Sequence, residues 1–228
     1  MLSPAEWEVI ALSLKVGAVA IGLTLPVAFG LAWVLARSRL PGKLLLDALV
    51  HLPLVLPPVV TGWLLLLAFG GQGPVGRVLE EWLGVSLMFR WTGAALAAAI
   101  MALPLMVRAM RISIEAVDRR LENAARTLGA SPWRTFWTIT LPLATPGVLA
   151  GGVLGFARSI GEFGATITFV SNIPGETRTL PLAIYSALQM PGGETAVTRL
   201  ALIAVALSLL ALAASEWLTR RSDHRYLG

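Results

Sequence analysis

Apolar residues dominate five long stretches of the chain, and shorter polar or glycine- and proline-rich intervals separate them. A helix needs roughly 20 apolar residues to span a bilayer, and the stretches cover about 11–36, 48–70, 92–110, 143–170 and 197–218. Backbone polar groups must be satisfied inside lipid, and the short alternating runs of a membrane barrel are missing from the sequence. The pattern predicts an all-α polytopic membrane protein with about five transmembrane helices, whose single transmembrane domain covers residues 11–217.

Two of these stretches carry residues that interrupt helices at membrane depth. The second holds Pro53, Pro57 and Pro58. Proline removes a backbone donor and clashes with the preceding turn, so the helix either breaks here or begins late, near Pro58. The fourth stretch is long, and we expect it to break before its end. Irregular backbone within a membrane is tolerated only against protein or a water-filled cavity, so the second stretch is expected to line something polar.

The fourth stretch combines small residues with two charges. Gly147, Gly151 and Gly155 recur every four residues, which predicts close contact with another helix, and a two-fold axis is one place for that contact. Arg158 and Glu162 follow, also four apart. Ionisable groups at this depth are costly unless they pair or face water. Two interpretations stay open: the pair marks a transport pathway, or it only locks helix packing.

Composition and charge fit a membrane protein. Hydrophobic residues make up 56% of the 228-residue chain and charged residues 14%, against about 25% charged in soluble domains. Basic residues gather after the first, third and fifth stretches, so the positive-inside rule places the N-terminus outside and the C-terminus in the cytoplasm. The loop at about residues 111–142 is then cytoplasmic. The basic excess follows this topology, and we expect membrane lipid, not nucleic acid, as a partner.

The interval at residues 123–142 is too patterned for a simple connector. Ala125 and Gly129 lie on a small-residue helix face, and a glycine suits the C-terminal cap of such a helix. Ser131-Pro132 suits the start of a second helix. The interval therefore predicts two short helices joined by a turn on the membrane surface, presented to another protein.

Sequence motifs for catalysis are missing. The chain has no phosphate-binding P-loop, no His-Glu-x-x-His motif and no cysteine, so it has no nucleotide site of the P-loop kind and no thiolate metal site. The histidines are His51, near the inner end of the second stretch, and His224, in the tail. We expect no catalytic residues, no bound metal and no cofactor, and any work must be driven by another subunit.

The cytoplasmic loop resembles the signature of type I ABC importer permeases: Glu-Ala-Ala, three residues, Gly, nine residues, Ile, one residue, Leu-Pro. Every spacing is kept, and Asn123 is the one departure, with Glu122 beside it. The resemblance implies coupling helices that dock on a cytoplasmic ATPase. Its candidate coupling residues are Glu122, Asn123, Ala124, Ala125, Gly129, Ile139, Leu141 and Pro142.

Further stretches resemble the permease subunits of molybdate ABC importers: 51–58, 124–129, 156–166 and 171–179. That resemblance implies a homodimer in a bacterial or archaeal cytoplasmic membrane, with two ATPase subunits that hold ATP and Mg²⁺ and an outer molybdate-binding protein. It also implies alternating access for molybdate, with tungstate accepted. Backbone N–H groups, hydroxyls and helix N-termini can hold a tetrahedral dianion. The pathway candidates are Thr61, Arg158, Ser159, Glu162, Thr166 and Thr168.

Other readings of the chain remain open. Sulfate or thiosulfate permeases are similar, and substrate competition separates them from molybdate permeases. A secondary transporter driven by an ion gradient would use Arg158 and Glu162 as its coupling site, and it would transport without ATP. An intramembrane enzyme has no motif in its favour.

Overall fold

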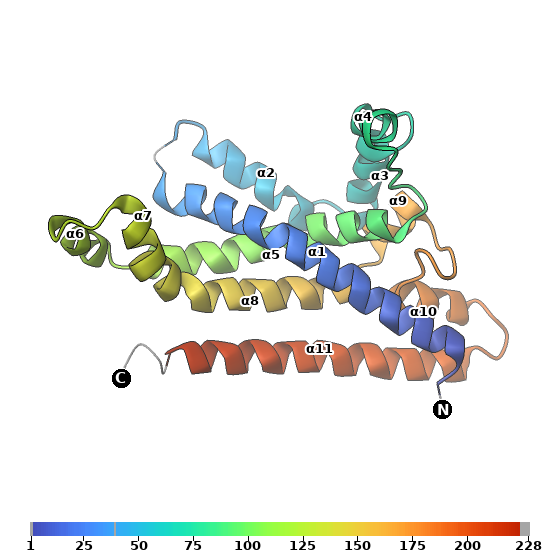
Figure 1. Cartoon of the computed structure of the whole chain (residues 1–228). Helices are drawn as coiled ribbons and strands as arrows, with labels where there is room; N and C mark the ends of the chain where they lie inside the picture. Colours follow the sequence, from blue (N-terminus) through green and yellow to red (C-terminus); the bar gives the residue numbers. More distant parts are fainter. Residues whose placement is uncertain (1, 39, 224–228) are drawn as a thin grey trace.

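The computed structural model describes residues 2–38 and 40–223, which contain helices and no strand. Four long helices lie side by side (Figure 1), and α5 packs between α1 and α8 while α11 packs on α8. The helix α1 begins at one end of the molecule, and α11 ends at the other (Figure 1). The elements are α1 (Pro4–Arg37), α2 (Lys43–Val55), α3 (Pro58–Phe69), α4 (Pro74–Leu83), α5 (Trp91–Ala116), α6 (Arg119–Thr127), α7 (Pro132–Thr135), η1 (Phe136–Thr140), α8 (Leu141–Ile160), α9 (Gly164–Val170), α10 (Leu180–Leu188) and α11 (Glu194–Asp223).

The number of spans agrees with the prediction. Among the described residues, four helical segments are long and apolar enough to cross a membrane, and a fifth span follows if α2 and α3 are taken together. These two helices are bent by 116° at the interruption between them. The helix α2 ends at Val55, and Pro58 opens α3. The predicted break is therefore confirmed. Its cause is that neither Pro57 nor Pro58 can donate the backbone hydrogen bond that would continue α2.

The fourth stretch also breaks as predicted. Its long helix ends at Ile160, and the short helix α9 begins at Gly164. The helix starts earlier than its apolar run, however, because α7, the π-helical turn η1 and α8 form one continuous helix from Pro132. The helix α5 likewise continues to Ala116. Only residues 117–131 therefore lie between the third and fourth spans.

The stripe formed by Gly147, Gly151 and Gly155 packs α8 closely against α5 of the same chain. A Cβ on Gly147 would lie 2.9 Å from the carbonyl oxygen of Ala109, and one on Gly155 would lie 2.7 Å from the side chain of Met106. The predicted close contact is confirmed, and it lies within the chain. Small residues let two backbones approach where van der Waals packing drives helix association in lipid.

Replacing Gly147 with alanine should destabilise the α5–α8 contact by about 1–3 kcal/mol, the usual cost of overpacking. The new methyl group would press on the backbone of α5. Gly152→Ala is the matched control, because its Cβ meets only the side chain of Leu25, at an ordinary 3.4 Å. Thermal unfolding of the purified variants measures the difference. Equal stabilities of the two variants would contradict the packing assigned to the stripe.

Candidate functional site

The turn between α6 and α7 has the chemistry that the sequence predicts. Gly129 has a φ of +87°, in the left-handed region that glycine adopts without strain. Its N–H donates to the carbonyl of Arg126 (3.0 Å), and the N–H of Ala130 donates to Ala125 (3.0 Å). The hydroxyl of Ser131 accepts from the N–H of Arg134 (3.2 Å). The end of α6 and the start of α7 are thus both capped, which fixes the orientation of α6 relative to α7.

Glu122 fastens α6 to the membrane helices. Its Oε1 lies 3.0 Å from Nη2 of Arg37, at the end of α1, and accepts a hydrogen bond from the hydroxyl of Thr140 (2.7 Å). The side chains of Arg37 and Glu122 are partly buried, and Thr140 is fully buried. The same Arg37 Nη2 donates to the carbonyl of Val117 (3.4 Å). The carboxylate of Glu122 therefore points into the protein, while the neighbouring Asn123 is exposed. Glu122 therefore holds α6, the first part of the predicted coupling segment (α6 to η1), against the membrane helices.

An apolar hollow of about 380 Å³ opens between α6 and the start of α8. Ala125, Ile139 and Pro142, predicted from the signature, line it together with Leu121, Thr138, Leu143 and the 89% exposed Leu128. Ala124 and Gly129 are exposed close by in sequence, and Leu141 is half-buried. Exposed apolar concavities of this kind are typical of surfaces that bind other proteins. The signature does not include Leu121 and Leu128, although positions 121, 125 and 128 fall on one helical face.

The two broken spans cross where α3 packs on α9. A Cβ on Gly62 would lie 2.6 Å from the carbonyl oxygen of Ala165. Thr61 is buried, and its Oγ1 has no hydrogen-bond partner among the described residues. Thr166 is buried on α9, and Thr168 donates to the carbonyl of Gly164 (2.8 Å). Three of the predicted pathway hydroxyls thus come from this pair of elements.

The charged pair joins Arg158, in the last turn of α8, to Glu162, in the break before α9. Nη1 of Arg158 is 2.7 Å from Oε2 of Glu162, and Oε1 of Glu162 accepts from the N–H of Ala165 (2.9 Å). Glu162 is 3% exposed. Its carboxylate therefore binds one N–H of the first turn of α9, that of Ala165. Ser159 lies elsewhere, because a Cβ on Gly17 of α1 would come within 3.0 Å of its Oγ.

A double-variant cycle separates packing from transport at this pair. Glu162→Gln keeps a hydrogen-bond acceptor for Ala165 but leaves Arg158 without its counter-charge. If the pair only locks packing, Arg158→Gln/Glu162→Gln should recover most of the thermal stability lost in Glu162→Gln, together with normal uptake. We expect stability to recover. Uptake that stays low in the stable double variant would assign the charges to the pathway.

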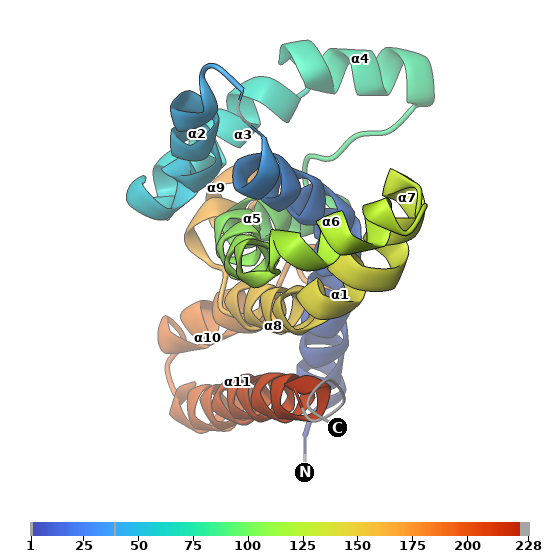
Figure 2. The same ribbon diagram turned by 90° about the vertical axis from the view of Figure 1, so that its left-hand side faces the viewer.

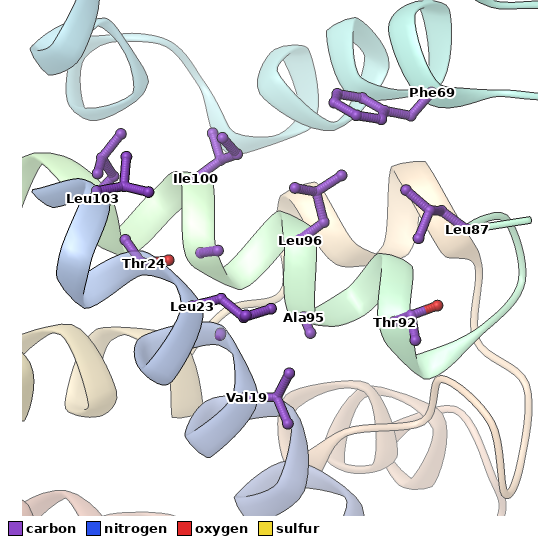
Figure 3. A pocket seen from close by; sticks show the side chains of 13 residues that line it. Val19, Leu23, Thr24, Phe69, Leu87, Thr92, Ala95, Leu96, Ile100 and Leu103 are labelled. Carbon is purple, nitrogen blue, oxygen red and sulfur yellow. The ribbon is translucent and has the colours of Figure 1, made fainter. Parts of the chain in front are cut away.

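The groove between α1 and α5 is unsuited to an anion (Figure 3). It encloses about 390 Å³, and aliphatic side chains such as Leu23, Leu96 and Ile100 surround it. Thr24 and Thr92 contribute the hydroxyls of its lining. A charged solute in such surroundings would lose its hydration without compensation.

The segment before α10 is a closed, hydrogen-bonded structure. The hydroxyl of Thr177 accepts from the N–H of Ile173 (2.8 Å) and donates to the carbonyl of Ser171 (3.1 Å). Arg178 donates to the side chain of Asn172 (2.9 Å). The helix α10 follows this segment from Leu180 to Leu188.

The described residues thus form a polytopic helical bundle with a capped helical turn and an apolar hollow at one end. A model of the family described as binding-protein-dependent transport system inner membrane component matches residues 25–224, and the chain belongs to this family. The solved inward-facing MetNI methionine ABC transporter has the same fold, with a TM-score of 0.69 and 17% identity over 96% of this chain and 94% of that one. The fold is that of type I ABC importer permeases.

Curated relatives cover nearly the whole chain. The molybdenum transport system permease protein ModB of Escherichia coli (strain K12) is 56% identical over 225 residues, 99% of this chain and 98% of the relative. ModB of Haemophilus influenzae is 58% identical over 96% of both chains. A probable sulfate transport system permease protein, cysT of Chlorokybus atmophyticus, is 39% identical over 70% of this chain and 55% of that protein.

Proposed function

We propose that this chain is the membrane-spanning permease subunit of an ATP-driven importer of molybdate, which also accepts tungstate. The observation that carries the proposal is its near full-length similarity to molybdenum permeases. The sulfate permease matches less of the chain and at lower identity, which supports molybdate over sulfate. The secondary-transporter alternative is disfavoured, since Glu162 is closed off by Arg158 and by the backbone of α9.

Two copies of the chain would enclose the path, each coupled to one ATPase subunit. Both α2 and α3 lie to one side of the layer formed by α1, α5 and α8 (Figure 2). Side chains on them are exposed, including Leu44 (83%), Val55 (81%) and Trp63 (52%). A second copy on this face would cover part of that surface and bring the α3–α9 crossings of the two copies together.

The proposed cycle is alternating access. ATP would close the two ATPase subunits, the coupling segments would follow, and the two permease halves would rock about their shared axis. Nη1 of Arg111 binds Asp47 on α2 (3.2 Å) and its Nε binds Glu115 on its own helix (2.8 Å). The α2–α3 bend leaves α2 separate from α3, so the Arg111–Asp47 pair would carry movement of α5 to α2.

The remaining assignments follow the same proposal. The chain would contribute no catalytic group and no cofactor site. The ATPase would bind ATP and Mg²⁺, and an outer molybdate-binding protein would determine which anion is taken up. The N-terminus would lie outside and the C-terminus in the cytoplasm of a bacterial or archaeal inner membrane, because the basic residues gather on the coupling side.

Competition tests the substrate. Liposomes that hold the permease and its ATPase, with binding protein outside and ATP inside, should take up labelled molybdate. Excess tungstate should suppress that uptake, and excess sulfate should leave it unchanged. Suppression by sulfate at equal excess would move the assignment to the sulfate permeases.

A further inference from the structure

The coupling segment has a second exposed apolar face besides the hollow at Leu128, and aromatic side chains form it. Five aromatic rings from α1 and the 132–140 helix form a connected cluster. Ring centroids of Trp33 and Phe136 are 5.2 Å apart, those of Phe136 and Trp137 are 5.3 Å apart, and those of Trp133 and Phe136 are 5.8 Å apart. Phe29 completes the cluster, with its ring 6.1 Å from that of Phe136.

The outer members of this aromatic cluster are exposed. Trp133 is 69% and Trp137 58% exposed, and they lie one helical turn apart on the same face. A hollow of about 830 Å³ lies beside them, lined by Phe29, Gly30, Trp33, Val34, Trp133 and Phe136 among others. The α1 residues of this lining belong to the apolar stretch at 11–36, so the hollow continues the lipid-facing surface of a membrane span.

Polar groups close to the cluster in sequence are of the kinds found at a membrane interface, and Arg134, which follows Trp133, is exposed. The side chain of Arg134 and the indole N–H groups of Trp33, Trp133 and Trp137 make no hydrogen bond or ion pair with any other described residue. Tryptophan is enriched at the headgroup level, where its ring is in contact with acyl chains and its N–H with polar groups. A basic side chain near an inner-leaflet surface attracts anionic lipid.

We propose that this aromatic face binds an anionic phospholipid of the inner leaflet, with acyl chain in the hollow and the headgroup phosphate at Arg134. The coupling segment is then held between two partners: lipid on the Trp133 face and the ATPase on the Leu128 face. Lipid on one side gives the segment a fixed support against which the ATPase acts. This goes beyond the proposed function, and only the identity of the second partner rests on it.

The chain has no cysteine, so single spin labels can report each face. Trp133→Cys and Leu128→Cys would be labelled with a nitroxide in the full complex with its ATPase, in phosphatidylethanolamine–phosphatidylglycerol vesicles. Collisions with oxygen report lipid, and collisions with a water-soluble nickel chelate report solvent. We expect an oxygen-to-nickel ratio at position 133 several times that at position 128, where the ATPase or water surrounds the label.

A label at position 133 that is open to nickel, or shielded from both reagents by another protein, would overturn the proposal. This measurement needs no transport, so it stands whatever the substrate. Replacing phosphatidylglycerol with a neutral lipid should lower the ratio at position 133, and Arg134→Gln should remove that lipid dependence, whereas Arg134→Lys should keep it. A ratio that ignores headgroup charge in the unsubstituted background would contradict the role of Arg134.

Discussion

Glu122→Ala should abolish most ATP-driven uptake while ATP hydrolysis continues. The substitution removes the shared carboxylate that joins α6 to Arg37 of α1 and to Thr140 before α8. It also leaves the Arg37 guanidinium, whose side chain is 12% exposed, without its counter-charge, at a cost of about 2–3 kcal/mol for such a partly buried site. The helix α6 would then move without carrying the membrane helices.

Two control variants separate this effect from loss of a surface charge. Glu122→Gln keeps an acceptor for the hydroxyl of Thr140 and should retain part of the uptake. Glu115→Ala removes a 46% exposed carboxylate that pairs with Arg111 four residues earlier, and such exposed pairs contribute about 0.3–0.5 kcal/mol. Uptake measured per ATP hydrolysed is the readout. Equal coupling in Glu122→Ala and in the unsubstituted protein would refute the positioning role.

Gly62→Ala should lower the rate of transport at least tenfold, because it forces the two broken spans apart. A methyl group at this position would lie 2.6 Å from the carbonyl oxygen of Ala165 and 2.8 Å from Cβ of Thr168. Both neighbours belong to a packed helix and cannot move alone, so α9 must shift away from α3. Overpacking of this kind costs about 1–3 kcal/mol, and it displaces the predicted pathway hydroxyls.

The matched control is Gly22→Ala, because a Cβ there meets no atom within 4 Å. It should leave uptake unchanged and can stabilise α1, since alanine favours a helix over glycine by up to about 1 kcal/mol. Initial rates of uptake at equal protein levels measure both variants. Full activity of Gly62→Ala would show that the α3–α9 crossing does not need its close approach.

Local chemistry made much of the fold predictable. The breaks in the second and fourth stretches follow from proline and from glycine-rich sequence, and the turn at Gly129 follows from its capping residues. These features depend on neighbours in the chain, so a single sequence carries them. The count of spans follows from apolar length alone.

Contacts between distant residues were not predictable in the same way. Nothing near Glu122 in sequence indicates that Arg37, 85 positions earlier, is its partner. Ser159 has the residue type of a pathway hydroxyl, yet Gly17 lies across from it on α1. The glycine stripe predicted a close contact without saying which helix would make it. Helix faces are readable from periodicity, whereas the pairing of faces is set by the three-dimensional packing of the bundle.

This chain should import an oxyanion only when an ATPase drives it. The most direct measurement compares labelled molybdate uptake in liposomes that hold the chain alone with uptake in liposomes that hold the chain and its ATPase, each with ATP inside and binding protein outside. We expect uptake only with both the ATPase and ATP. Uptake by the chain alone, driven by an ion gradient, would contradict it.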